Sequence, residues 1–188
     1  HACYAPADEA LSLHAIYCIF YRRVACHLVS VGGFWLSPTP HVPGSLGWDS
    51  ACGRLAAWVR LIDKASSNEF RLVNTHLDHL GQQARENQAR IVNEDADAYP
   101  RDYPQLLSGD MNCPAGNPAI DTFPKGGWHD TYTQVHGNEE PGPTFHGFQG
   151  FTARDEEDAA KTIAGKLQQD LAVAPTAAPE VKDQLWKK

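Results

Sequence analysis

The strongest constraint on the fold is a succession of strand, helix and strand in which both strands end in polar side chains. The stretch FRLVNTHL, residues 70–77, has the apolar and β-branched content of a strand. GQQARENQARIVNEDADA, residues 81–98, predicts a helix with a narrow apolar face at Leu80, Ala84, Ile91 and Val92. PQLLSGD, residues 104–110, predicts another strand, buried through its Leu106–Leu107 pair. A domain of class α+β is therefore expected.

Other elements follow from the same kind of pattern. IYCIFYRR, residues 16–23, and RLAAWVRLID, residues 54–63, predict strands, and the second is expected to form a hairpin with residues 70–77 across the polar KASSNE turn. Residues 32–53 are rich in glycine, proline and tryptophan, which predicts a long ordered loop whose aromatic residues pack against the domain.

The sequence changes character toward its end. NPAIDTF, residues 117–123, predicts a short helical turn, whereas GWHDTY at residues 127–132 and GPTFHGF at residues 142–148 predict irregular or short extended pieces. Large apolar residues become rare after Phe151. We therefore expect one domain over residues 1–151, followed by a tail over residues 152–188 that includes an amphipathic helix at 155–171.

Composition narrows the function classes. The 188 residues carry a formal net charge of −7, and no basic face is expected that would bind nucleic acid tightly through charge alone. The five cysteines argue against a disulfide framework but leave room for a single bridge. There is no charged-then-apolar leader and no apolar run near the roughly 20 residues of a membrane helix, which favours a cytoplasmic location.

Two polar motifs carry the candidate chemistry. NTHLDHL ends its strand with Asn74 and His76 on one face, and the ordinary alternative is a polar strand end. A zinc ion held by His76 and His79 is a weaker alternative, since no third ligand lies near in sequence. SGDMN places the oxygens of Asp110 and Asn112 on one side of the chain. These suit Mg²⁺ or Mn²⁺, although the same residues also favour a simple turn.

Taken together, the order and spacing of FWLSPTP, GSLGWDSACGRLAAWVRL, FRLVNTHLDHLGQQAR, LLSGDMN and GPTFHGF resemble the endonuclease/exonuclease/phosphatase superfamily. The resemblance covers roughly residues 15–150, and the Phe-Trp-Leu-Ser loop resembles a largely uncharacterised subgroup. It implies a deoxyribonuclease I-like fold, a four-layer α/β/β/α sandwich that would be incomplete in this chain. It also implies a phosphoester hydrolase that depends on Mg²⁺ or Mn²⁺.

The resemblance also implies roles for individual residues. His76 would act as an acid/base or orient the phosphate, Asp110 would activate water or bind metal, and Asn112 would contact the scissile phosphate or the metal. Arg54 would contact substrate phosphate. Asn74 and His146 are further candidates for substrate binding, with His146 equally able to be a packed loop histidine.

Several motifs of the superfamily have no counterpart here. They are an early Gln-Glu metal motif, a glutamate near residues 14–16 that would pair with His76, and a late Arg-Ile-Asp strand followed by Ser-Asp-His. His76 is thus expected to lack its carboxylate partner. Either the chain is a fragment or faulty gene model, which we favour, or it is a degenerate member of the superfamily.

Two functions follow from these expectations. The first is a monomeric, metal-dependent hydrolase of phosphoesters, acting on nucleic acid or on a small phosphorylated molecule. The alternative is a non-catalytic member that keeps the fold and binds phosphate or a partner. A chain lacking the outer strands of a sandwich is also expected to be marginally stable or prone to aggregation.

Overall fold

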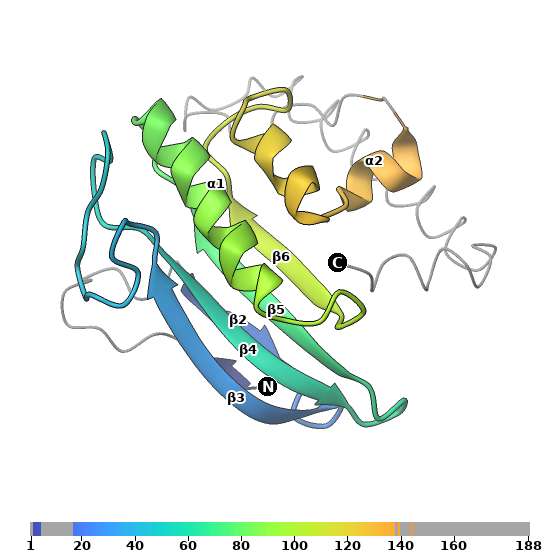
Figure 1. The fold of residues 1–188 in the computed structure, drawn as a ribbon. Coiled ribbons are helices and arrows are strands. Elements are labelled where there is room, and N and C mark those ends of the chain that lie inside the picture. Colours follow the sequence, from blue (N-terminus) through green and yellow to red (C-terminus); the bar gives the residue numbers. More distant parts are fainter. Residues whose placement is uncertain (1, 5–16, 138, 140–143, 145–188) are drawn as a thin grey trace, which may run out of the picture. The chain divides into compact units, whose positions relative to one another are not determined.

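The computed structural model describes residues 2–4, 17–137, 139 and 144 (Figure 1). The chain divides into two compact units, the first extending to His129 and the second beginning at Asp130. The predicted domain boundary at residue 151, the helix at residues 155–171 and His146 lie outside the described residues. They stay predictions.

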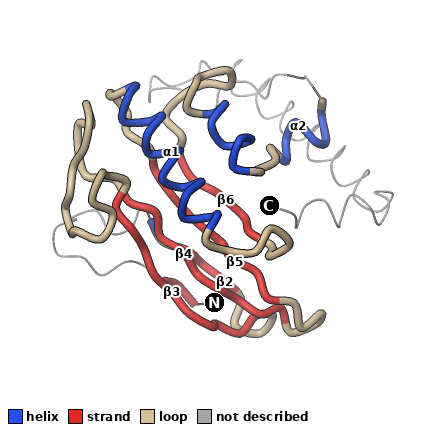
Figure 2. The backbone as a smooth tube through the Cα atoms, viewed as in Figure 1, coloured by secondary structure: helices blue, strands red, loops and turns tan. Residues whose placement is uncertain are grey.

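The first unit is built on a mixed four-stranded sheet in the order β3-β4-β5-β6 (Figure 2). Its strands are β3 (Cys26–Trp35), β4 (Leu55–Asp63), β5 (Glu69–His76) and β6 (Gln105–Asp110). The pairs β3–β4 and β4–β5 are antiparallel, and β4 and β5 form the expected hairpin. The pair β5–β6 is parallel. A second sheet consists of β1 (Ala2–Tyr4) and β2 (Ile19–Tyr21), paired antiparallel.

Helix α1 (Gln82–Asp97) connects β5 to β6, as a parallel pair of strands requires, and covers one face of the four-stranded sheet (Figure 1). Ala89, Val92 and Ala96 of α1 pack with Val73 of β5 in one core. The 3₁₀ helix η2 (Ile120–Gly126) packs against α1 and contributes Phe123 to this core.

A second core lies on the opposite face of the sheet. Ile19 of β2 packs there with Leu55, Ala57 and Val59 of β4. Helix, sheet and second sheet are thus three successive layers, which agrees with the expected α+β sandwich over the described part of the chain.

Arg71 of β5 ties α1 to the sheet although its side chain is completely buried. Its guanidinium forms an ion pair with Asp95 of α1 at 2.6 Å and donates to Gln105 of β6 at 3.1 Å. The same group lies over the rings of Trp58 and Tyr99. A buried arginine is stable when it is paired and hydrogen-bonded in this way.

Helix α2 (Thr131–His136) belongs to the second unit. Its N-terminus is capped by Asp130, whose Oδ1 accepts from the backbone N–H of Tyr132 at 2.9 Å. The irregular structure predicted for residues 127–132 is therefore wrong from Thr131 onward, because the Asp-Thr pair forms a helix cap instead of a turn.

Three further predictions need correction near the N-terminal side of the sheet. Residues 32–35 belong to β3 instead of the loop, and residues 26–31, for which no element is predicted, form the rest of that strand. The strand predicted over residues 16–23 extends only over Ile19–Tyr21. β3 is difficult to recognise because a bulge between Leu28 and Ser30 interrupts its alternation.

Two packing predictions are also wrong. Leu80 is 70% exposed, because it precedes α1 and does not share the buried face of that helix. Leu106 and Leu107 are only half-buried, since β6 is the edge strand of the four-stranded sheet among the described residues. The rest of the apolar face of α1 is confirmed, with Ala84, Ile91 and Val92 buried.

Candidate functional site

The candidate site lies where the parallel strands β5 and β6 end. His76 and Asp110 are the last residues of the two strands, and the register pairs them directly. His76 Nε2 lies 3.5 Å from Asp110 Oδ2. Asp110 is thus a carboxylate neighbour of His76 that was not paired with it from the sequence, whereas residues 14–16, where the missing glutamate was expected, lie outside the described residues.

Asn112 closes the turn after β6. Its backbone has a left-handed φ of 51°, and its N–H donates to Asp110 Oδ1 at 2.9 Å. Its Nδ2 donates to the carbonyl of Leu77 at 2.8 Å. Because the amide nitrogen faces a carbonyl, the side-chain oxygen is left as an acceptor for another group.

The surroundings of His76 favour the neutral form of its imidazole. Burial lowers the pKa of His76 below 6.5, the positive charge of Arg54 lowers it further, and the carboxylate of Asp110 opposes both effects. The side chain remains 23% exposed. A neutral, partly exposed imidazole can accept a proton from a bound water molecule.

Asp78 forms a buried hub beside this pair. Its side chain is completely buried, with Oδ1 accepting from the N–H groups of Leu80 and Gly81. Its Oδ2 accepts from Ser50 Oγ at 3.0 Å and Ala51 N at 2.9 Å, both from the loop before β4. Burial raises the pKa of Asp78, but these hydrogen bonds outweigh it and lower the pKa to about 2.

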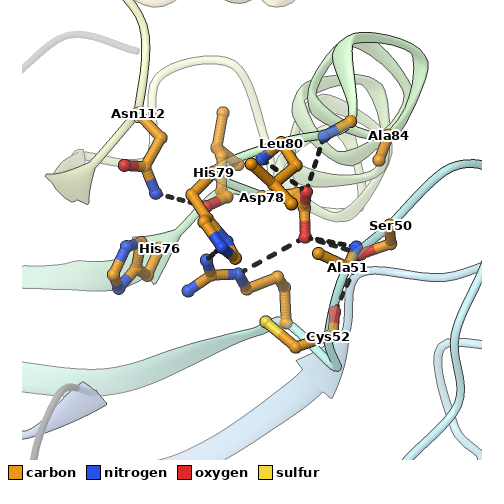
Figure 3. Close-up of polar contacts among 12 residues, drawn as sticks. Ser50, Ala51, Cys52, His76, Asp78, His79, Leu80, Ala84 and Asn112 are labelled. Carbon is orange, nitrogen blue, oxygen red and sulfur yellow. Dashed lines mark hydrogen bonds and ion pairs between the residues drawn. The ribbon is translucent and has the colours of Figure 1, made fainter.

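Arg54 connects the hub to the two histidines. Its side chain is 7% exposed, with Nε 3.8 Å from Asp78 Oδ2 and Nη2 3.0 Å from His79 Nδ1. In Figure 3, His76, His79 and Asn112 lie at one end of the cluster, and Asp78 lies at the other with Ser50 and Ala51. Arg54 thus lies among these residues with its side chain buried, and its contact with substrate phosphate stays a prediction.

Asn74 is half-buried on the same side of β5 as His76. Its Nδ2 donates to the carbonyl of Cys18 at 3.4 Å, and its Oδ1 accepts from Ser108 Oγ at 3.4 Å. Substrate binding by Asn74 stays a prediction. Through these hydrogen bonds, Asn74 also joins β5 to the backbone before β2 and to β6.

The oxygens at the end of β6 fit a divalent cation. The side chain of Asp110 is 62% exposed, and Asn112 Oδ1 receives no hydrogen bond from the described residues. Mg²⁺ commonly takes one or two protein oxygens and completes its shell with water and substrate phosphate. Asp110 and Asn112 can supply such a pair. No third His, Cys or carboxylate ligand joins Asp110 and His76 within the part of the chain that the structure describes.

A second group of possible ligands fits a metal poorly. Cys52, Asp78 and His79 bring ligand atoms within 4.8 Å of one another. Both oxygens of Asp78 already accept two hydrogen bonds each, and the guanidinium of Arg54 lies beside them. If a cation bound there, Asp78 would lose those hydrogen bonds, and the positive charge of Arg54 would repel the cation. Among the described residues, no group of three or more ligands includes both His76 and His79, so the zinc hypothesis for them gains no third ligand.

The roles of Asp78 and Ser50 are not predicted from the sequence. One signal was present, since an aspartate often accepts hydrogen bonds from backbone N–H groups two and three residues later, as Asp78 does from Leu80 and Gly81 just before α1. Ser50 carries no comparable local signal, because its partner is distant in sequence.

Comparison with known proteins gives matches among solved structures only. Neither a scan against models of protein families nor a search of curated proteins gives a match. An endonuclease/exonuclease/phosphatase family protein from Bacteroides thetaiotaomicron is 39% identical, over 56% of this chain and 38% of its own, with a TM-score of 0.53.

Two other structures agree with that match. A mannosyl-6-phosphatase from the same organism is 37% identical, over 56% of this chain and 40% of its own, with a TM-score of 0.54. An endonuclease/exonuclease/phosphatase from Bacteroides vulgatus is 29% identical, over 64% and 47%, with a TM-score of 0.59. The chain therefore spans less than half the length of these three structures. Among the described residues, no helix is long and apolar enough to cross a membrane.

Proposed function

The chain belongs to the endonuclease/exonuclease/phosphatase superfamily and has the α+β, deoxyribonuclease I-like fold over part of its length, and on this basis we propose that it hydrolyses phosphoesters. The observation that carries the proposal is the pairing of His76 with Asp110 at the ends of β5 and β6. This geometry supports catalysis better than a role in phosphate or partner binding alone, since a simple binding site has no need of a neutral imidazole beside a carboxylate.

His76 and Asp110 would act on the attacking water. The neutral imidazole accepts a proton of the water as the water attacks phosphorus and the P–O bond to the alcohol breaks. Asp110 stabilises the imidazolium that forms, and the departing alcohol oxygen takes up a proton from solvent. Asp110 raises the pKa of His76 against the effects of burial and Arg54, so it increases the basicity of the imidazole. General-base catalysis of this kind contributes about 10²- to 10⁴-fold to a rate.

Asn112 and a divalent cation would act on the phosphate. The cation, Mg²⁺ or Mn²⁺ on Asp110 and Asn112 Oδ1, would supply positive charge to the non-bridging oxygens when bound. Asn112 Nδ2 carries two hydrogens, and one of them bonds the carbonyl of Leu77. The other is directed away from that carbonyl and can donate to substrate. Arg54 adds positive charge from below the surface.

The substrate class we favour is a small phosphorylated molecule. The net charge of −7 does not favour a long polyanion, and a mannosyl-6-phosphatase is among the structures similar to this chain. Because this chain covers only part of that structure, sugar phosphates are a proposal for the class of substrate. Nucleic acid is the alternative that the test distinguishes.

The test is hydrolysis of p-nitrophenyl phosphate and bis-p-nitrophenyl phosphate by the 188-residue chain, with Mg²⁺ or Mn²⁺ and with EDTA. We expect turnover that EDTA abolishes and that is faster with the monoester. His76→Gln and Asp110→Asn should each lower kcat/KM by about 10²-fold or more. The acid limb of the pH profile should titrate below 6.5, because the pKa of His76 is lowered.

Matched controls separate chemistry from folding. His41→Gln and Asp102→Asn make the same substitutions at exposed positions away from the strand ends and should leave kcat/KM unchanged. Turnover that persists in both His76→Gln and Asp110→Asn would contradict the proposed site, and turnover that withstands EDTA would contradict the metal. A preference for the diester, or for single-stranded DNA over mannose 6-phosphate, would favour a nuclease.

A further inference from the structure

The contact between Arg54 and His79 defines which nitrogen of His79 carries its proton. Arg54 Nη2 lies 3.0 Å from His79 Nδ1. A guanidinium has only donors and does not lose its proton in proteins, so Nδ1 must be the acceptor in this contact. A neutral His79 with Nδ1 unprotonated carries its hydrogen on Nε2, and that N–H is directed away from Arg54.

Arg54 is held firmly enough to maintain this arrangement. Its side chain is 7% exposed and its Nε faces the completely buried carboxylate of Asp78 at 3.8 Å. Asp78 is itself fixed by hydrogen bonds from the loop at Ser50 and Ala51 and from the start of the helix at Leu80 and Gly81. The hub therefore positions Arg54, and Arg54 positions the imidazole of His79.

His79 is also in the right place to meet substrate. It is exposed and follows His76, the last residue of β5, by three residues. In Figure 3, His79 lies between Asp78 on one side and His76 and Asn112 on the other. An outward N–H donor beside the proposed catalytic pair is suited to bind an oxygen anion.

We propose that His79 is a phosphate-binding residue, whose Nε2–H donates to a non-bridging oxygen of the substrate while Arg54 acts as its positioning residue. The inference rests on the proposed function and deepens it by naming a second histidine with a role distinct from that of His76. His76 would exchange a proton with water, whereas His79 would keep its proton and supply binding energy.

The first test is the tautomer itself, measured on the full chain by two-bond ¹H–¹⁵N correlation NMR at pH 8 without metal. We expect the Nε2–H form for His79. Titration with inorganic phosphate should then shift the ring signals of His79, while the exposed His41 serves as the unperturbed control. A dominant Nδ1–H form, or ring signals of His79 that phosphate does not move, would overturn the inference.

The second test uses two substitutions that each keep one nitrogen position of the imidazole. In His79→Asn, the amide oxygen can take the place of Nδ1 and keep the bond from Arg54, but no donor remains at Nε2. In His79→Gln, the amide nitrogen can reach the place of Nε2 and keep that donor. We expect His79→Asn to raise KM, and the Kd for inorganic phosphate, about tenfold, as for a lost charge-assisted hydrogen bond.

The division between KM and kcat distinguishes binding from folding or catalysis. His79→Asn should leave kcat within about twofold of the wild type, since uniform binding energy enters KM and not kcat. His79→Gln should recover part of the lost affinity. Unchanged KM and Kd in His79→Asn, or a lower kcat with unchanged KM, would count against the inference. If the wild type lacks turnover but phosphate still shifts His79, the proposed function fails and the binding role of His79 stands.

Discussion

Asp78 is the residue whose importance is least apparent in its local sequence. It follows the strand in a polar stretch, Thr-His-Leu-Asp-His, that is typical of a solvent-exposed strand end. The structure buries its carboxylate completely and surrounds it with two loop donors, two helix-start donors and Arg54. One carboxylate thus joins three segments that are separate in sequence.

We predict that Asp78→Asn destabilises the first unit by about 3–5 kcal/mol, because it leaves the buried guanidinium of Arg54 without its counter-charge. The amide also replaces one acceptor oxygen with a donor that faces other donors. Urea unfolding followed by circular dichroism measures the change. Asp102→Asn, at an exposed position, is the control and should alter the free energy of unfolding by less than about 0.5 kcal/mol.

The same carboxylate predicts a pH dependence of stability. The pKa of Asp78 is about 2 in the folded protein, below its ordinary value of 3.8, so the folded state favours the charged form. Its contribution, about 2 kcal/mol, is fully present above pH 3.8 and decreases as the pH falls toward 2. Asp78→Asn should remove this part of the acid dependence. An unchanged acid limb would mean that Asp78 does not titrate as its hydrogen bonds imply.

Among the elements, the succession β5, α1 and β6 is the part best predicted from sequence. Each of the three elements is long enough for its pattern to outweigh local irregularity, and no observed bound differs from its predicted bound by more than one residue. β3 and α2 are missed for a physical reason. A bulge and two consecutive glycines disguise the strand, and α2 is short enough that its cap residues resemble a turn.

Gly109 in β6 is required by the close pairing of the parallel strands. Its φ is +144°, and an added Cβ would collide with the carbonyl of Thr75 in β5. We predict that Gly109→Ala costs roughly 3 kcal/mol or more, from backbone strain and overpacking together. Asp110 is the next residue, so displacement of this strand end should also lower the proposed phosphoesterase activity.

Gly116 provides the matched control for this substitution. It also has a positive φ, +78°, but nothing lies within 4 Å of an added Cβ. Gly116→Ala should therefore cost only the backbone term, about 1–2 kcal/mol, and leave activity intact. Equal losses of stability in the two variants, measured by thermal unfolding, would show that the contact with Thr75 is unimportant.

For the whole molecule, the second core is the weaker of the two. Leu28 and Val31 of β3 pair with Leu61 and Val59, so they extend the apolar face that those residues form, yet they are 45% and 39% exposed. Phe20 of β2 belongs to the same unit and is 69% exposed. An apolar face that continues into solvent promotes association between molecules.

We predict that the purified 188-residue chain self-associates with increasing concentration, as measured by sedimentation velocity. A double substitution, Leu28→Lys with Val31→Lys, should reduce the association because it places charge on the open face. Val135→Lys is the control, because Val135 is 50% exposed on α2 of the second unit. A chain that stays monomeric at high concentration and unfolds reversibly would contradict both this prediction and the expected marginal stability.

Sequence alone predicted the strands and helix that carry the site, the places of His76, Asp110 and Asn112 near strand ends, and the resemblance to the superfamily. These follow from local periodicity and from residues close together in the chain. The folded structure was needed to show that Asp110 lies beside His76, that Asp78 is buried and charged, and that Arg54 contacts His79. Those contacts depend on strand register and on loop packing across 25 or more residues, which local patterns do not encode.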